Sequence, residues 1–216
     1  MLQTLILIPT SGEQQILRPR LASCIGDSVR VELCGFGPVA AAARTSQLIA
    51  ALQPARILLV GIAGSLDREL APGHAAEFEH VAMYGIGAGT GDTYRNAGEL
   101  GWPHWTATTR EGGRIHVGDR ISLQQTDQEP DSGAQLLTVC AAAATQKDVR
   151  DRLAKFPDAR AEDMEGFSVA FAGGLGNVPV RIIRGISNVA GDRDKARWRI
   201  TDALHAAADL VAEILS

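Results

Sequence analysis

Four short segments of the chain combine polar side chains with positions where a predicted strand ends. They are residues 10–13, 61–67, 163–166 and 187–188, and among them stand two carboxylates, Glu13 and Glu165, and one amide, Asn188. Ligands of α/β proteins bind beyond the carboxyl ends of the strands. Carboxylates can take protons or accept hydrogen bonds, whereas an amide both donates and accepts. We therefore expect these side chains to share one site.

The elements that must position these residues alternate between apolar runs and amphipathic segments. Strands are predicted at residues 2–8, 29–34, 57–60, 135–139 and 180–187, and helices at 39–52, 162–173 and 195–215, with another helix ending near 155. A further helix opens with a Thr-x-x-Glu capping box at residues 10–13 and is expected to break or kink at Pro19. Strand 57–60 is expected to end in a glycine turn at 61–64. Alternating strands and helices predict an α/β fold with a largely parallel central sheet.

Length and composition limit the possible functions. The chain has 216 residues, which suits one domain spanning 1–216 with a core large enough to need no disulfide or metal. Its net charge is −4 and only 5% of its residues are aromatic, so a surface that binds nucleic acid is not expected.

Neither cysteines nor histidines suggest a metal site. The three cysteines are far apart and the five histidines show no ligand spacing, so we expect no metal and a reducing, cytoplasmic location. No basic leader and no apolar stretch of membrane-spanning length is present in the sequence, so no membrane partner is expected.

One glycine motif suggests a dinucleotide site. Gly35-x-Gly37-x-x-Ala40 follows a predicted strand and opens a helix. The acidic residue expected at the end of the next strand is missing, because that strand runs directly into Gly61. The dinucleotide interpretation is therefore weak.

Three further motifs together resemble the purine nucleoside phosphorylase and nucleosidase superfamily. They are Gly-Ile-Ala-Gly-Ser-Leu at residues 61–66, Glu-Asp-Met-Glu-Gly at 162–166 and Arg-Gly-Ile-Ser-Asn at 184–188. The match runs in order over nearly the whole chain. Two stretches are most similar to the futalosine hydrolase branch of that superfamily. They are Asp-Met-Glu-Gly-Phe at residues 163–167 and Ile-Ser-Asn-Val-Ala-Gly-Asp-Arg-Asp at 186–194. The resemblance implies a three-layer fold with a mixed, largely parallel sheet between helices, and hydrolysis of a nucleoside without a cofactor.

This resemblance implies a role for most of the candidate site residues. Glu165 would accept hydrogen bonds from the ribose 2′- and 3′-hydroxyls, with Met164 packed under the sugar and the backbone of Ala63 and Gly64 close to sugar and base. The alternative for Glu165 is an exposed acid in the first turn of a helix, where negative charge is favoured in any case. The small residues at 141–144 would let the purine lie against the backbone, unless they only pack as a helix.

Glu13 would orient and deprotonate the attacking water. The capping box explains Thr10 and Glu13 without any catalysis, so both interpretations stay open.

Asn188 replaces the aspartate that nucleosidases of 6-aminopurines carry at this position. An amide can donate to a purine O6 and accept from a protonated N7, which favours hypoxanthine over adenine. An amide is not an ordinary acid, so Asp192, Asp194 or water would have to supply the proton. Alternatively, Asn188 is only a turn residue after a strand.

Two apolar residues near Gly61, Leu59 and Ile62, favour hydrolysis over phosphorolysis. Phosphorylases of the superfamily carry arginine and threonine where this chain has Leu59 and Ile62. An apolar lining cannot hold a phosphate dianion, so water is the expected nucleophile.

Residues 90–95 and 98–109 are expected to form a loop over the site, and the segment 84–110 is expected to read the 5′ substituent of the substrate. Its polar and aromatic residues are Tyr84, Asp92, Tyr94, Arg95, Trp102, Trp105 and Arg110, of which an arginine could pair with a substrate carboxylate. A homodimer or higher homo-oligomer is implied by the resemblance. Two alternatives remain: another purine nucleosidase or phosphorylase, and a non-catalytic nucleoside-binding protein.

Overall fold

The computed structural model describes residues 3–108, 114–123 and 134–216, and its centre is a nine-stranded sheet. The strands run in the order β10-β5-β11-β12-β3-β1-β2, with β13 paired to both β3 and β4. Pairing is parallel except between β10 and β5, β12 and β3, and β13 and β4. The mixed, largely parallel sheet is therefore confirmed.

The sheet strands are β1 (Thr4–Ile8), β2 (Val29–Leu33), β3 (Arg56–Ser65), β4 (Ala75–Phe78), β5 (His80–Tyr84), β10 (Arg120–Ser122), β11 (Gln135–Val139), β12 (Ala159–Asp163) and β13 (Val180–Val189). Two small hairpins, β6 (Gly87–Ala88) with β7 (Arg95–Asn96) and β8 (Trp105–Thr108) with β9 (Arg114–Val117), lie outside it. The helices are α1 (Ser11–Leu21), α2 (Pro38–Leu52), α3 (Gln146–Lys155), α4 (Gly166–Leu175) and α5 (Ile200–Leu215), with 3₁₀ turns at Gly91–Thr93 and Lys195–Arg197.

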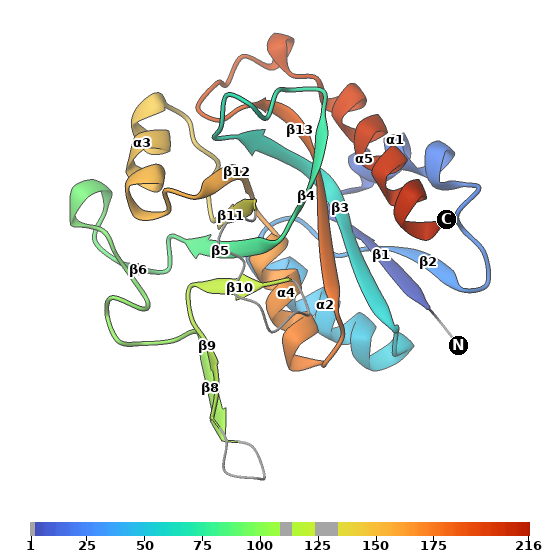
Figure 1. The fold of residues 1–216 in the computed structure, drawn as a ribbon, viewed down its shortest axis with the longest axis horizontal. Helices are drawn as coiled ribbons and strands as arrows, with labels where there is room; N and C mark the ends of the chain where they lie inside the picture. The colour runs from blue at the N-terminus through green and yellow to red at the C-terminus, as the bar shows by residue number, and fades with distance from the viewer. Residues whose placement is uncertain (1–2, 109–113, 124–133) are drawn as a thin grey trace.

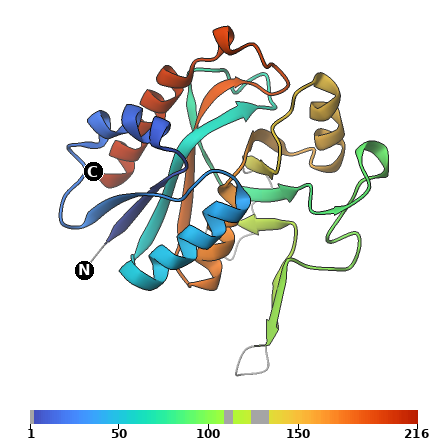
Figure 2. The same cartoon turned by 180° about the vertical axis from the view of Figure 1, so that it is seen from behind.

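Helices cover both faces of the sheet, as Figure 1 and Figure 2 show from opposite sides. In β1, Ile6 and Ile8 pack under α1 and α5, whereas Leu5 and Leu7 pack on the side of α2 and α4. This follows from the two-residue period of a strand, because an all-apolar strand suits a sheet that is buried on both faces. Complete burial of each such side chain contributes about 1.5–3 kcal/mol. The three-layer architecture is thus built from the predicted apolar runs.

The predicted glycine turn at residues 61–64 is wrong, because β3 continues through it to Ser65. On one side β13 pairs with β3 from Ile57 onward, and on the other β12 adds antiparallel pairs at Gly64 and Ser65. Neighbouring strands on both sides override the local preference of glycine for turns.

The predicted helix at 162–173 also needs correction. Glu162 and Asp163 end strand β12, and α4 begins only at Gly166. The turn between them is fixed by the Asp163 carboxylate, which accepts from the backbone N–H of Gly166 at 2.8 Å and from the hydroxyl of Thr138 at 2.7 Å. Because these contacts come from β11 as well as β12, local helix propensity could not reveal the boundary.

Smaller differences occur at other helices. α1 continues two residues past Pro19 to Leu21. The terminal helix α5 starts at Ile200, after the 3₁₀ turn at Lys195–Arg197. Pro38 occupies the first position of α2, as expected. In the described residues no helix is long and apolar enough to cross a bilayer.

Candidate active site

A pocket of about 820 Å³ opens where β3, β12 and β13 reach their carboxyl ends, beside the start of α1. All six residues predicted from the sequence line it: Glu13, Ala63, Gly64, Met164, Glu165 and Asn188. They come from four separate segments of the chain, and the sheet order alone brings them together.

Glu13 forms the capping box and also lines the pocket. Its Oε2 accepts from the backbone N–H of Thr10 at 3.0 Å and from the Thr10 hydroxyl at 2.6 Å, which completes the capping box. Its Oε1 accepts from the backbone N–H of Ile62 at 3.0 Å. The carboxylate is only 7% exposed and is held from two directions. Capping by Glu13 and its place in the pocket lining are therefore compatible.

A buried arginine lies behind the pocket. Arg184 of β13 has no exposed surface, and its Nη2 pairs with the carboxylates of Asp163 and Glu165. Burial opposes its charge, but Asp163, Glu165 and Glu13 together keep the pKa of Arg184 above its ordinary value. Among the described residues, its Nε and Nη1 have no hydrogen-bond partner.

Gly61 makes room for this arrangement. A Cβ at Gly61 would overlap Nη1 of Arg184 and lie 2.8 Å from Oε1 of Glu13. The bare glycine backbone therefore lets the guanidinium and the carboxylate approach the same point. This is a close-approach glycine within a strand, not a turn glycine.

Glu165 is the N-cap residue of α4 and is only 4% exposed, so the alternative of an exposed first-turn acid is wrong. Its Oε1 accepts from the backbone N–H of Gly37 at 3.0 Å, and its Oε2 from Arg184 at 3.2 Å. Burial raises its pKa to about 7, and the nearby Asp163 charge adds to this, while Arg184 and the Gly37 N–H act in the opposite direction.

The glycine motif near residue 37 has a role in this contact. Gly37 has φ +83° and is the N-cap of α2, and this conformation presents its N–H to Glu165. Positive φ is readily adopted only by glycine. The motif thus supports a carboxylate of the pocket.

Asn188 is oriented by its neighbours at the end of β13. The hydroxyl of Ser187 donates to its Oδ1 at 2.8 Å, and its Nδ2 donates to the carbonyl of Val189 at 2.9 Å. One N–H of the amide and one lone pair of Oδ1 remain for a ligand. A Cβ added to Gly64 would lie 3.6 Å from Nδ2 of Asn188, so the amide and Gly64 form one wall of the pocket.

Comparison with known proteins gives a family. The model of the phosphorylase superfamily matches residues 23–216. The chain belongs to the phosphorylase superfamily. It is 34% identical over 189 residues to the futalosine hydrolase of Streptomyces coelicolor, covering 83% of this chain and 75% of that protein. It is 26% identical over 200 residues to the 5′-methylthioadenosine/S-adenosylhomocysteine nucleosidase of Maridesulfovibrio salexigens, covering 88% and 81%.

Solved structures share the fold. The native futalosine hydrolase of Helicobacter pylori superposes with a TM-score of 0.77 at 15% identity, covering 99% of this chain and 97% of that chain. The 5′-methylthioadenosine/S-adenosylhomocysteine nucleosidase of Neisseria meningitidis, in complex with methylthio-immucillin-A, gives 0.76 at 16% identity, covering 100% and 99%. The resemblance and the fold expected from the sequence are confirmed.

The described residues of the segment 84–110, which are 84–108, do not line the pocket of the single chain. Tyr94 is buried and packs against Tyr84, with ring centroids 4.6 Å apart and the rings tilted by 42°, while Trp102 lies largely in solvent. The expectation of a loop over the site is therefore wrong for one chain. Arg110 lies outside the described residues.

The two aspartates considered as proton donors also lie off the pocket lining. Asp192 accepts from the backbone N–H of Asp194 and from Arg197, which hold its pKa below its ordinary value. Asp194 caps the 3₁₀ turn that follows. Neither is among the residues that line this pocket.

Sequence analysis missed the buried charges behind the pocket. Arg184 and Asp163 were noted only as parts of motifs, and Arg152, which forms a buried ion pair with Glu162, was not considered. The available signal was Arg184 itself, since a charged residue inside an apolar strand needs a buried partner. Within the described parts of the chain, no cluster of three metal-ligating side chains is present.

Proposed function

We propose that this protein hydrolyses the N-glycosidic bond of futalosine and releases hypoxanthine, as a step of menaquinone biosynthesis in the cytoplasm. The observation that carries the proposal is the convergence of Glu13, Glu165 and Asn188 on one pocket. The 34% identical futalosine hydrolase supports the choice of substrate. The whole chain, 1–216, would act as a single catalytic domain.

Glu13 is the proposed general base. It would take the proton of a water molecule held in the pocket beside its carboxylate. A base within hydrogen-bond reach of the attacking water contributes about 10²–10⁴-fold to the rate.

Glu165 is the proposed ribose ligand. Its two oxygens would accept from the 2′- and 3′-hydroxyls, and the negative charge would stabilise the ribosyl cation that develops as the bond breaks. Met164 would pack against the sugar, and the backbone of Ala63 and Gly64 would lie beside sugar and base. These roles require the ionised form of Glu165.

Asn188 is the proposed contact to the departing base. The free N–H of Nδ2 would donate to O6 of hypoxanthine, and the free lone pair of Oδ1 would accept from N7 once N7 is protonated. Ser187 and Val189 support this orientation of the amide, since each holds one end of it. With Asp192 and Asp194 away from the pocket, water is the proposed source of the N7 proton.

Water is preferred to phosphate as the nucleophile because of the lining near Glu13. Pro9, Ile16 and Ile62 contribute apolar surface there, and Leu59 is fully buried in the core. A phosphate dianion would lose its hydration without enough donors to replace it. The second candidate function is the nucleosidase activity of the 26% identical relative, which Asn188 disfavours because adenine carries an amino group where hypoxanthine carries O6.

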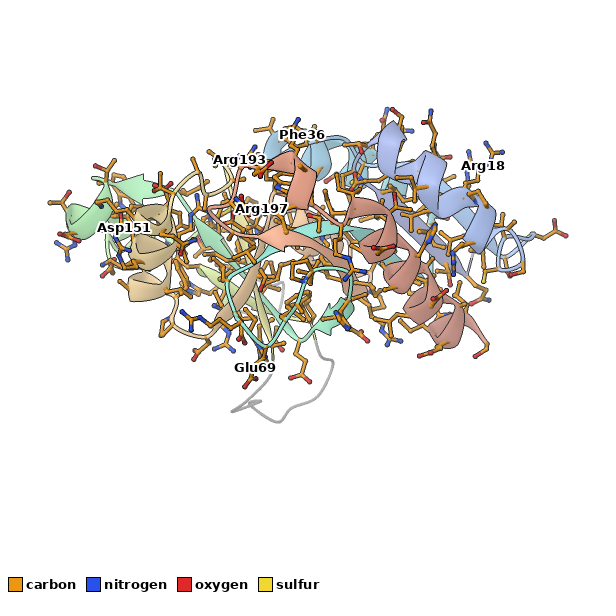
Figure 3. The ribbon with its side chains drawn as sticks, turned by 90° about the horizontal axis from the view of Figure 1, so that it is seen from above. Arg18, Phe36, Glu69, Asp151, Arg193 and Arg197 are labelled. Atoms are coloured by element: carbon orange, nitrogen blue, oxygen red, sulfur yellow. The ribbon has the colours of Figure 1, made fainter. Side chains whose placement is uncertain are left out.

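A homodimer or higher homo-oligomer is also proposed. Phe36 and Val39 are 66% and 82% exposed, and Phe36 lines the pocket. Figure 3 shows Phe36 on the same side of the molecule as Arg193, another pocket residue. A second chain that covers this apolar surface would complete the part of the pocket that receives the 5′ substituent.

The test is chromatography of futalosine incubated with the protein, with and without phosphate, beside inosine and methylthioadenosine. We expect release of hypoxanthine from futalosine that does not depend on phosphate and that falls about 100-fold or more in Glu13→Gln. Phosphate dependence would favour the phosphorylase alternative, and faster release of adenine would favour the methylthioadenosine nucleosidase. No release at all would favour a binding protein.

A further inference from the structure

Part of the pocket wall next to Asn188 is made by a segment that belongs to no helix or strand. Residues 140–144 connect β11 to α3 without helix or strand, and Ala142 and Ala144 line the pocket. Ala143 packs against Val149 and Ala190, and the N–H of Ala144 donates to Asp148 at 3.0 Å, but residues 140, 141, 142 and 144 are exposed and, among the described residues, Ala142 has no packing of this kind. The helical packing considered from the sequence is absent here, so the backbone must be held by other groups.

A buried ion pair holds this backbone at two points. Oε1 of Glu162 accepts from the N–H of Ala143 at 2.8 Å, and Nη2 of Arg152 donates to the carbonyl of Ala141 at 2.7 Å. Nη1 of Arg152 and Oε2 of Glu162 form the ion pair between them. One backbone N–H and one backbone carbonyl of the segment are thus hydrogen-bonded to the two side chains of the same ion pair.

The ion pair of Arg152 and Glu162 lies directly beside the pocket wall. Arg152 comes from α3 and Glu162 from β12, and the Arg152 guanidinium also lies 5.7 Å from the centre of the Tyr84 ring. A Cβ at Gly64 would lie 3.5 Å from Cγ of Glu162 and 3.6 Å from Nδ2 of Asn188, so both residues lie against the same glycine. The held segment and the amide therefore form adjoining parts of one wall.

Stability alone gives little reason for such a pair. Both side chains are more than nine-tenths buried, and an apolar pair of similar volume is often as stable or more stable than a buried ion pair. Apolar side chains could not bind the peptide groups of Ala141 and Ala143. Placement of the backbone is what the charged pair provides.

We propose that Arg152 and Glu162 are positioning residues that fix residues 141–144 as the surface against which the leaving base lies. The inference rests on the proposed function, in that the pocket must bind a purine nucleoside. A wall of this kind contacts the base in the substrate, in the transition state and in the free base. Its loss should therefore raise KM and weaken binding of the free base while kcat and binding of the sugar change little.

Two double variants test the proposal without leaving a buried charge unpaired. Arg152→Met with Glu162→Met removes both anchors, whereas Arg152→Met with Glu162→Gln keeps an oxygen that can accept from Ala143. The exposed pair of Arg181 with Glu77, on β13 and β4, supplies the control Arg181→Met. Thermal unfolding of each variant reports whether it folds.

The readouts are the inhibition constants of hypoxanthine and of the base-free sugar product, with KM and kcat on the nucleoside. For the Met/Met variant we expect the constant for hypoxanthine to rise about 10-fold or more, and that for the sugar product to stay within about 2-fold. The Met/Gln variant should lie between it and the wild type. The control Arg181→Met should leave both constants unchanged.

Equal losses of base and sugar affinity, or no loss of either, would overturn the positioning role, as would a Met/Gln variant no better than Met/Met. A wild-type protein that binds adenine instead of hypoxanthine would refute the proposed substrate, and the same comparison would then be made with adenine. A wild-type protein that binds no purine would refute both proposals. The two failures are therefore distinguishable.

Discussion

Replacement of Gly61 by alanine tests the arrangement of Glu13 and Arg184 most directly. The new methyl group would overlap Nη1 of Arg184, lie 2.8 Å from Oε1 of Glu13 and lie 3.0 Å from Cδ of Pro9. Arg184 cannot move away easily, because it is fully buried and tied to two carboxylates. The strain must therefore fall on Glu13, on Arg184 or on β3 itself.

The expected cost can be worked out from this crowding. Adding one methyl group to a tightly packed site destabilises a protein by about 1–3 kcal/mol. For a chain of this length that lowers the melting temperature by roughly 2–12 °C. Displacement of the base should reduce kcat/KM about 100-fold or more, since a general base contributes about 10²–10⁴-fold.

The assay combines thermal unfolding with the rate of hypoxanthine release. Gly174→Ala is a matched control, because Gly174 lies in α4, away from the pocket lining, and an added Cβ there meets nothing within 4 Å. This control should be as stable as the wild type or more stable by up to about 1 kcal/mol, with unchanged activity. If Gly61→Ala kept both the melting temperature and the activity of the wild type, the close approach of Glu13 and Arg184 would play no part in catalysis.

Three further predictions follow from the same site. Because the pKa of Glu165 is raised to about 7, kcat/KM should fall as the pH drops below 7. The same shift should make the fold more stable as the pH falls from 7 to about 4.5, since the folded protein binds this proton more tightly than the unfolded chain does. A pH profile of kcat/KM together with unfolding at pH 5.5 and 8 checks both signs, and an acidic limb of the profile near pH 4.5 would contradict them. Asn188→Asp should shift the preference from hypoxanthine toward adenine, measured as the ratio of kcat/KM on inosine and methylthioadenosine, and an unchanged ratio would remove Asn188 from base selection. Arg184→Met should destabilise the fold by about 3–5 kcal/mol, because Asp163 would be left buried without its cation; denaturant unfolding measures this, and Arg184→Lys, which keeps the charge, should lose clearly less.

Local features of the chain were predictable wherever a few neighbouring residues decide the structure. The capping box of Thr10 and Glu13, Pro38 at the start of α2 and strand β11 all form as expected. The fold class and the membership in the superfamily also follow from residue patterns, and the six candidate residues do meet in one pocket. Their chemical roles are still proposals.

Errors arose where tertiary contacts override local preference. Residues 61–64 read as a turn but form a strand because β12 and β13 pair on both sides of them. Glu162 and Asp163 read as the start of a helix but end a strand, and the hydroxyl of Thr138, 25 positions away from Asp163, helps to hold the turn that follows. Local propensities contain no information about such partners.

The sequence by itself determined the fold class, most of the helices, five of the sheet strands in outline and the chemical types of the site residues. Only the tertiary structure decided which charges meet: Arg184 with Asp163 and Glu165, and Arg152 with Glu162. The physical reason is that helix and turn signals act over about four residues, whereas these contacts depend on the order of strands in the sheet. Burial makes each of these ion pairs important for stability, because a charge that is removed from water interacts strongly with the few charged groups near it and is costly when left unpaired.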